Sequence, residues 1–328
     1  MEDEKYMRRA LQLARNGEAH TAPNPMVGAV IVCDDHILGE GYHIRCGQAH
    51  AEVNAVRSVQ KRSLLRHATI YVTLEPCAHY GKTPPCADLL IAEGIPRMVI
   101  GCRDPFAKVD GLGIRKLREA GCEVEVGVLE HECRYLIRRF LTFHTRQRPY
   151  ITLKWAESAD GFIDRKRTGG TPTLLSNPLT SMLVHRLRAS HDAILVGTRT
   201  ALLDNPSLTV RNWYGHAPLR VVIDRHHVLP STLQLFNDEA PTLCFDGDTL
   251  EQLLQQLHRQ NIQSLLVEGG STLLQAFIDA QLWDEAVVET APIALVEGVS
   301  SPVLTSFYTV QSHFGHRFRH YTNPTPAL

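Results

Sequence analysis

His50 and Glu52, together with Cys77 and Cys86, are the residues of this chain whose types and spacing best suit chemistry. An imidazole and two thiolates are good zinc ligands, and zinc held by three protein ligands keeps a fourth position open for water. The bound metal lowers the pKa of that water to near neutrality. Glu52, two residues after His50, can move protons between the water and a substrate. The pattern predicts one catalytic zinc ion per chain and hydrolytic chemistry.

The order of these residues matches a known signature. His-x-Glu, followed by Pro-Cys and a second Cys, is typical of zinc-dependent deaminases, in which the Glu carries protons and is not a ligand. Eight residues, 78–85, separate the two cysteines here, instead of two. A tight Cys-x-x-Cys hairpin is therefore excluded, but a Gly- and Pro-containing loop can still return Cys86 to the metal. The alternative, ordinary buried thiols and a surface His50, leaves the matching Glu and Pro unexplained.

The composition favours a small-molecule substrate. The chain has 328 residues, enough for about two domains, and a net charge of −1. A charge so close to zero gives no broad attraction to nucleic acid or to an anionic membrane. Eight scattered cysteines, without a signal-peptide pattern or an apolar stretch of bilayer length, lead us to expect a cytoplasmic protein. We expect the cysteines other than Cys77 and Cys86 to be buried or incidental.

Helix and strand patterns alternate along the chain, which predicts two α/β domains. The first, residues 1–145, should contain helices at 6–15, 51–59 and 87–93 and strands at 27–32, 70–74 and 98–101. A basic segment poor in apolar residues, 142–149, is the expected linker. The second domain, 146–328, should begin with a strand at Tyr150 and contain helices at 179–188, 250–260 and 272–281 and strands at 193–196, 220–223 and 265–267. Glu52 would lie in the first turn of a helix, and Cys77 and Cys86 near a helix N-terminus that favours thiolates.

The strongest local signal of the second half is residues 266–272, LVEGGST, where a strand runs into two glycines before a helix. Glycines at such a turn let backbone N–H groups approach a phosphate, and the helix N-terminus favours its charge. A tight turn that needs glycine conformations explains the pattern equally well. No GxGxxG motif is present, so a Rossmann-type nucleotide site has no support. The pattern alone does not identify a function for this half.

Longer motifs carry a resemblance across nearly the whole chain. The first half contains MRRALQLA, PNPMVGAVIV, GEGYH, AHAEVNA, YVTLEPCAHYGKTPPC and RDP. The second half contains LKWAESADG, RLRASHDAILVGTRTALLDNPSLTVR, PLRVVID and VEGGSTL. In order and spacing these segments resemble the bifunctional deaminase/reductase family of riboflavin biosynthesis, most specifically in the first half.

This resemblance implies a fold and an activity for each half. Residues 1–145 would form a cytidine-deaminase-like α/β/α layered domain, and residues 146–328 a dihydrofolate-reductase-like α/β domain. The first would use zinc to hydrolyse the ring amine of 2,5-diamino-6-ribosylamino-4(3H)-pyrimidinone 5′-phosphate. The second would use NADPH to reduce the ribosyl group of the product to ribityl, since the cofactor delivers hydride and the protein supplies geometry.

The resemblance also implies roles for individual residues. The zinc ligands would be His50, Cys77 and Cys86, and the proton carrier Glu52. Positions that look like the family's substrate contacts are Asn24, His43, Lys82 and Asp104 in the deaminase half, and Arg188, Leu208, Arg211 and Glu268 in the reductase half. Positions that look like its dinucleotide contacts are Ala156, Thr200, Asp204, Gly270, Ser271 and Thr272. Lys82 and the two arginines suit a phosphate group, and Glu268 can accept hydrogen bonds from the base or ribose.

The sequence departs from the family pattern at two places. Leu174-Leu175-Ser176 stands where a Trp-Ile-Thr or Trp-Ile-Ser segment is usual, so an aromatic cofactor contact is missing. Arg225 stands where a Ser or Thr is common, and we hypothesise that it reads the 2′-phosphate of NADPH. An unchanged preference for NADPH over NADH in an Arg225→Ala variant would refute this. No residue of the second half is a convincing general acid.

Two other classes of protein fit parts of the pattern. A nucleic-acid base deaminase would share the zinc site, but it should show a basic groove and stacking aromatic residues. The near-zero charge and 7% aromatic content disfavour it. A zinc-stabilised binding protein would have no use for Glu52. We therefore expect an enzyme without nucleic-acid or membrane partners, and a homo-oligomer, because domains of this kind often assemble symmetrically.

Overall fold

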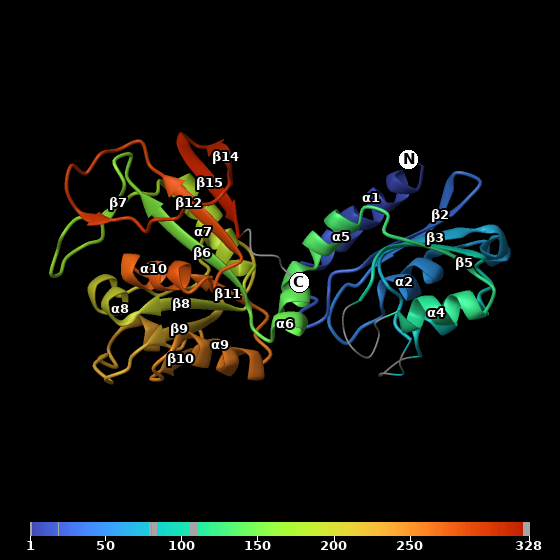
Figure 1. Cartoon of the computed structure of the whole chain (residues 1–328), viewed down its shortest axis with the longest axis horizontal. Coiled ribbons are helices and arrows are strands. Elements are labelled where there is room, and N and C mark those ends of the chain that lie inside the picture. Colours follow the sequence, from blue (N-terminus) through green and yellow to red (C-terminus); the bar gives the residue numbers. More distant parts are fainter. Residues whose placement is uncertain (1, 19, 79, 81–83, 105–110, 324–328) are drawn as a thin grey trace. The chain divides into compact units, whose positions relative to one another are not determined.

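The computed structural model describes residues 2–18, 20–78, 80, 84–104 and 111–323. The chain divides into two compact units, Met1–Arg146 and Gln147–Leu328 (Figure 1). None of the helices in these described ranges is long and apolar enough to span a bilayer. The site residue Lys82 lies outside the described residues.

The first unit is a five-stranded sheet with helices on both faces (Figure 1). The strand order is β2-β1-β3-β4-β5; β1 runs antiparallel to β2 and β3, whereas β3, β4 and β5 are parallel. The strands are β1 (Gly28–Cys33), β2 (His36–Tyr42), β3 (Thr69–Leu74), β4 (Arg97–Cys102) and β5 (Glu123–Val126). The α-helices are α1 (Glu2–Ala14), α2 (Ala51–Ser58), α3 (Cys86–Ala92), α4 (Leu112–Glu119), α5 (Glu130–Leu136) and α6 (Arg138–Arg146).

Alternate residues of the central strands point into two separate cores. Ala29 and Ile31 of β1 pack with α2, α3 and α4, whereas Val30 and Val32 pack with α1 and α5. Every residue of β1 is buried, because both faces of the sheet are covered. The first unit is thus an α/β/α sandwich, which confirms the layered fold expected from the sequence.

The expected linker, residues 142–149, contains the division between the two units at Arg146/Gln147, but its first part is wrong. Residues 142–146 belong to α6, and Phe140, Leu141 and Phe143 of that helix are buried. Residues 142–149 contain only one strongly apolar side chain, Phe143, so the segment taken by itself conceals the amphipathic helix that begins four residues earlier. The strand expected at Tyr150 does begin there.

The second unit contains an eight-stranded sheet in the order β10-β9-β8-β11-β6-β12-β15-β14. Neighbouring strands from β10 to β12 are parallel, and β15 and β14 are antiparallel additions. The strands of this sheet are β6 (Tyr150–Glu157), β8 (Ala193–Gly197), β9 (Leu219–Ile223), β10 (Thr242–Phe245), β11 (Ser264–Val267), β12 (Glu285–Thr290), β14 (Tyr308–His313) and β15 (His316–Thr322). A separate pair consists of β7 (Phe162–Asp164) and β13 (Val299–Ser300), and the α-helices are α7 (Pro178–Ala189), α8 (Thr198–Asp204), α9 (Leu250–Arg259) and α10 (Ser271–Asp279).

Parallel strands matter here because their carboxyl ends meet at one edge of the sheet, where ligands of open α/β sheets bind. Ala156 lies near the carboxyl end of β6, Thr200 follows β8, and Glu268 follows β11. The helices and strands expected from the sequence in this half are all present within two residues of their expected ends. The antiparallel strands and β7, β10 and β12 were not foreseen, whereas the short helix expected before Asp204 is present as α8.

Candidate active sites

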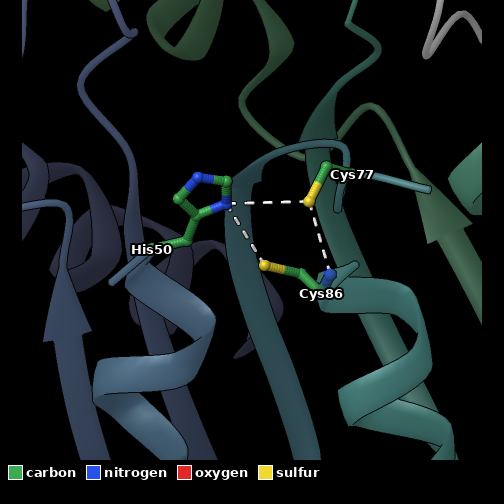
Figure 2. Close-up of side chains that lie close together, drawn as sticks. All are labelled: His50, Cys77 and Cys86. Atoms are coloured by element: carbon green, nitrogen blue, oxygen red, sulfur yellow. Dashed lines mark hydrogen bonds between the residues drawn. The ribbon is translucent and has the colours of Figure 1, made fainter. Parts of the chain in front are cut away.

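The metal-ligand candidates come from three elements of the first unit that meet at one point (Figure 2). His50 precedes the first residue of α2, Cys77 follows β3, and Cys86 begins α3. The Nδ1 atom of His50 lies 3.3 Å from Cys86 Sγ and 3.6 Å from Cys77 Sγ. The three ligand atoms all lie within 4.8 Å of one another, the only such group of three among the described residues.

These distances fit a zinc ion. Zinc–sulfur bonds of about 2.3 Å and zinc–nitrogen bonds of about 2.0 Å at a tetrahedral angle place the two ligand atoms about 3.5 Å apart. The two measured nitrogen–sulfur distances lie on either side of this value. The loop of residues 78–85 therefore returns Cys86 to the centre despite its length, as expected from the sequence.

One of the two sulfurs is prepared electrostatically for a cation. A hydrogen bond from the Cys86 thiol, together with one from His50, lowers the pKa of Cys77 to about 4 although burial opposes this shift. The backbone N–H of Cys86 also donates to Cys77 Sγ at 3.3 Å. The same sulfur–sulfur hydrogen bond and burial raise the pKa of Cys86. The pair therefore holds a thiolate in the folded chain, and a thiolate is the form that binds metal.

Glu52 lies in the first turn of α2, and only 3% of its surface is exposed. Burial raises the pKa of its carboxyl group, while the nearby His50 imidazole lowers it. Glu52 is outside the group of three ligand candidates. A buried carboxyl with a raised pKa beside the metal-ligand candidates is suited to accept and return a proton.

Asn24 and His43 form a hydrogen-bonded pair beside the metal-ligand candidates. The Nδ1–H group of His43 donates to Ala49 O at 3.1 Å, which leaves Nε2 to accept from the Asn24 amide at 3.2 Å. Burial lowers the pKa of His43, so the neutral ring is favoured. The His43 and His50 rings lie edge to face with centroids 5.4 Å apart. The structure thus brings together Asn24, His43 and the metal-ligand candidates.

Glu75 is a buried carboxylate that the sequence analysis missed. It lies between β3 and Cys77, and it accepts backbone hydrogen bonds from Gly111 (3.1 Å), Gly113 (3.0 Å) and Ile114 (3.3 Å). It also accepts a longer one from Asp104, at 3.4 Å. Asp104, a predicted substrate contact, is thereby held near the Cys77 segment. The signal in the sequence was a carboxylate directly after a strand of mostly apolar and β-branched residues, in TLEPC.

In the second unit, Arg188 and Glu268 form a nearly buried ion pair. Arg188 Nη2 lies 2.6 Å from Glu268 Oε2, and Nε lies 3.0 Å from Oε1. Burial alone would raise the pKa of Glu268, but the Arg188 charge and hydrogen bonds outweigh it and lower the pKa. The structure joins these two predicted substrate contacts side chain to side chain. Arg188 therefore faces a carboxylate in the chain itself, which the sequence analysis did not anticipate.

The segment of residues 207–211 holds the other two predicted substrate contacts. Leu208 is buried and has a φ of 52°, a backbone conformation unusual for a branched side chain. Arg211 donates from Nη1 to Thr209 Oγ1 at 3.2 Å, and its backbone N–H donates to Nδ1 of His185 at 3.2 Å. Arg188 Nη1 donates to Thr209 O at 3.4 Å. The predicted substrate contacts of the reductase half thus form one connected group.

The predicted dinucleotide contacts are only partly brought together. The Gly270 N–H donates to Thr200 Oγ1 at 3.0 Å, and Ser271 Oγ donates to Ser300 O at 2.7 Å. Asp204, at the end of α8, pairs with Arg167. A Cβ at position 269 would lie 2.6 Å from Leu273 Cδ2, so close packing accounts for one of the two glycines. Ala156 packs against the buried cluster of Leu175, Ala291 and Leu295.

Ser271 and Thr272 open α10, with Gly270 as its N-cap. Arg225, two residues after β9, donates from Nη2 to Asp248 O at 2.5 Å and is exposed. That Arg225 reads the 2′-phosphate of NADPH stays a prediction.

Arg220 is a further residue that pattern reasoning missed, and it contacts the segment of residues 207–211 through Ser207. The side chain is completely buried in β9, without a carboxylate partner in the hydrogen bonds of the described residues. Its guanidinium donates to oxygens of Ser207 (3.4 Å), Gln234 (3.1 Å), Asn237 (2.8 and 2.6 Å) and Ala240. A buried charge is stable there because several oxygens replace its water.

We expect Arg220→Met to destabilise the second unit by about 3 kcal/mol or more, because several buried carbonyl oxygens would lose their donor. The three tryptophans of the chain, Trp155, Trp213 and Trp283, all belong to this unit, so tryptophan fluorescence during urea unfolding reports on it selectively. The midpoint should fall, while the zinc binding expected of the first unit is retained. Arg259→Met, an exposed arginine on α9, is the matched control. An unchanged midpoint for Arg220→Met would contradict this role.

Comparison with known proteins agrees with the two sites. Residues 1–102 match the family described as cytidine and deoxycytidylate deaminase zinc-binding region, and residues 149–312 match the RibD C-terminal domain. The riboflavin biosynthesis protein RibD of Aquifex aeolicus is 40% identical over 321 residues, covering 91% of this chain and 89% of the relative. The RibD protein of Escherichia coli K12 is 39% identical, covering 89% and 88%.

Two solved structures cover almost the whole chain. The diaminohydroxyphosphoribosylaminopyrimidine deaminase/5-amino-6-(5-phosphoribosylamino)uracil reductase of Thermotoga maritima superposes with a TM-score of 0.89 at 35% identity, covering 98% of this chain and 99% of that one. RibD of Acinetobacter baumannii gives a TM-score of 0.88 at 32% identity, covering 98% of each. The resemblance drawn from the sequence motifs is confirmed: the chain belongs to the RibD family of riboflavin-biosynthesis proteins, which join a zinc-binding deaminase domain to a reductase domain.

Proposed function

We propose that this chain catalyses two successive steps of riboflavin biosynthesis. The first unit hydrolyses the ring amine of 2,5-diamino-6-ribosylamino-4(3H)-pyrimidinone 5′-phosphate, which releases ammonia. The second unit reduces the ribosyl group of the product to ribityl, giving 5-amino-6-ribitylamino-uracil 5′-phosphate. The observation that carries the proposal is the convergence of His50, Cys77 and Cys86 beside the buried carboxyl group of Glu52.

In the deaminase unit, His50, Cys77 and Cys86 would hold zinc, which would supply an activated water for hydrolysis at the ring carbon that carries the amine. Glu52 would be the residue that holds a proton and delivers it to the departing amine. Asn24 and His43 orient the pyrimidine. Their side chains are hydrogen-bonded to each other beside the metal-ligand candidates, so both are held in place. Asp104 and Lys82 complete the contacts, with Lys82 assigned to the phosphate on the family pattern alone.

In the reductase unit, Arg188, Leu208, Arg211 and Glu268 bind the substrate. NADPH supplies the hydride when bound. Its contacts are Ala156, Thr200, Asp204 and the turn of Gly270, Ser271 and Thr272. The turn suits a phosphate group because it stands at the N-terminus of α10, whose first N–H groups have no partner within the helix. Glu268 holds Arg188 in place and has its ionised form stabilised by that arginine, so both reach the substrate preorganised.

We further propose that the enzyme acts on a small molecule, has no nucleic-acid or membrane partner, and is a homo-oligomer in the cytoplasm. A reducing compartment fits the eight cysteines, all of which are free thiols in the structure.

One preparation of the purified chain tests the whole proposal. We expect one zinc per chain, ammonia release from the diaminopyrimidine substrate, and NADPH oxidation that requires the deaminated product. Zinc with ammonia release but no NADPH oxidation would leave only the deaminase. Absence of ammonia release from zinc-loaded protein would refute the first half of the proposal.

A further inference from the structure

His185 is a buried imidazole of α7 that contacts the segment of residues 207–211. It lies three residues before Arg188, so the two side chains share one face of the helix. Only 4% of its surface is exposed, and Thr180 is the one other buried residue along the described length of α7. An imidazole removed from water in this way needs polar partners within the chain. The partners of His185 therefore indicate what the ring does.

The ring of His185 is an acceptor for the backbone of Arg211. Its Nδ1 atom accepts the Arg211 N–H at 3.2 Å. Among the hydrogen bonds of the described residues, this N–H has no other acceptor. A ring nitrogen accepts a hydrogen bond only when it carries no proton. The hydrogen-bond network thus assigns His185 as a neutral ring with its proton on Nε2.

Residues 207–211 depend on such side-chain contacts. They lie between α8 and β9 and belong to no helix or strand, so no regular backbone ladder holds them. Arg188 and Arg220 each donate to a carbonyl oxygen of the segment, at 3.4 Å in both cases. The bond from Arg211 N to His185 is shorter, and it lies at the end of the segment that carries the Arg211 side chain. His185 is therefore the closest backbone anchor of that end.

Positive charges surround the ring. Burial lowers the pKa of His185, and the charges of Arg188 and Arg211 lower it further. The Glu268 carboxylate acts in the opposite direction but does not outweigh them, and it also faces the positive charge of Lys154 on β6. A proton on the ring would add a cation beside two arginines. It would also turn an N–H group of the ring toward the N–H of Arg211.

We propose that His185 is a positioning residue of the reductase site: as a neutral acceptor it fixes residues 207–211, and with them the guanidinium of Arg211, for the phosphate of the substrate. The inference rests on the proposed function, which assigns Arg188 and Arg211 to that substrate. Protonation of the ring breaks the contact. A bound phosphate offsets the added charge, but it does not restore the missing acceptor. Substrate affinity should therefore fall in acid.

The test compares His185→Leu with His185→Gln in the full-length chain. Leucine fills the space without an acceptor, whereas the side-chain oxygen of glutamine can still accept from Arg211. Calorimetry without NADPH gives the dissociation constant of the deaminated product at about pH 8, where histidine is neutral. We expect His185→Leu to raise it about 10-fold, the effect of a buried donor that loses its acceptor. His185→Gln should stay within about 2-fold of wild type, because it keeps the acceptor.

Steady-state kinetics separate positioning from a general structural role. His185→Leu should raise KM for the deaminated product and leave kcat nearly unchanged, because a phosphate contact away from the reacting carbon stabilises ground state and transition state alike. His191→Gln is the matched control. His191 is 5% exposed, follows the same helix and bonds to Leu187 O and Thr152 Oγ1, outside the substrate contacts. Its dissociation constant and KM should match those of wild type.

The dependence of binding on pH is a second readout. Wild-type protein should lose affinity below about pH 6.5, the ordinary pKa of histidine, because burial holds the pKa of His185 lower still. His185→Gln has no proton to gain at this position, so it should lose less. The substrate phosphate also titrates near pH 6, but it does so equally with both proteins, and their difference isolates His185.

Three results would overturn the inference: unchanged binding in His185→Leu, equal weakening in His185→Gln and His185→Leu, or the same acid loss in wild type and His185→Gln. The comparison of wild type with His185→Gln stands even if the leucine variant does not fold. Wild-type protein that binds no deaminated product would instead refute the proposed reductase function, and this inference with it.

Discussion

Glu52→Gln should abolish deamination while leaving the metal centre in place. Glutamine has nearly the same shape as glutamate, but it cannot accept a proton from water and return it to the leaving amine. General acid–base catalysis of this kind contributes about 100- to 10,000-fold to a rate, so we expect ammonia release to fall at least about 100-fold. Because Glu52 is not one of the three ligand candidates, the zinc-to-chain ratio should stay at one.

Two measurements separate this role from a structural one. The variant should still oxidise NADPH when given the deaminated product, since that reaction belongs to the second unit. Glu289→Gln, which alters an equally buried carboxyl group in the second unit, should leave ammonia release unchanged. If Glu52→Gln kept full deamination, the assigned role would be wrong; if it lost zinc, Glu52 would belong to the ligand set.

The sequence predicted the metal centre well because its chemistry is concentrated in short motifs. His50 and Glu52 lie two residues apart at the start of one helix. They stay close together wherever the helix is predicted to begin. Cys77 and Cys86 follow an apolar strand that pairs within the sheet, so the fold brings them to the same edge as His50. The length of the loop between the cysteines did not matter, because only its end points are fixed by the metal-ligand geometry.

The interactions that hold the sites together were not predictable in the same way. The oxygens around Arg220 belong to residues up to twenty positions away, and Glu75 binds backbone groups about forty positions later. Backbone donors and acceptors are common to nearly all residues, so no sequence motif marks them. The Arg188–Glu268 pair joins residues 80 positions apart. The sequence analysis assigned each of them to the substrate, whereas the structure shows them bound to each other.

The antiparallel strand β14 was missed for a related reason. The exposed strand β14 has no alternation of buried and exposed residues, because neither of its faces is covered within the chain. A pattern method recognises a strand by its buried side, and β14 has none.

Cys86→Ser should remove stoichiometric zinc and, with it, deamination. A serine hydroxyl does not ionise near neutral pH, so the centre would lose one of two anionic ligands, and metal affinity depends on deprotonated ligands. Cys133→Ser is a closely matched control, because both thiols are 1% exposed but Cys133 lies outside the ligand group. It should keep one zinc per chain by elemental analysis, so any loss that it shows measures the general cost of a buried hydroxyl. Zinc retained in Cys86→Ser, with ammonia release intact, would place the metal on other residues.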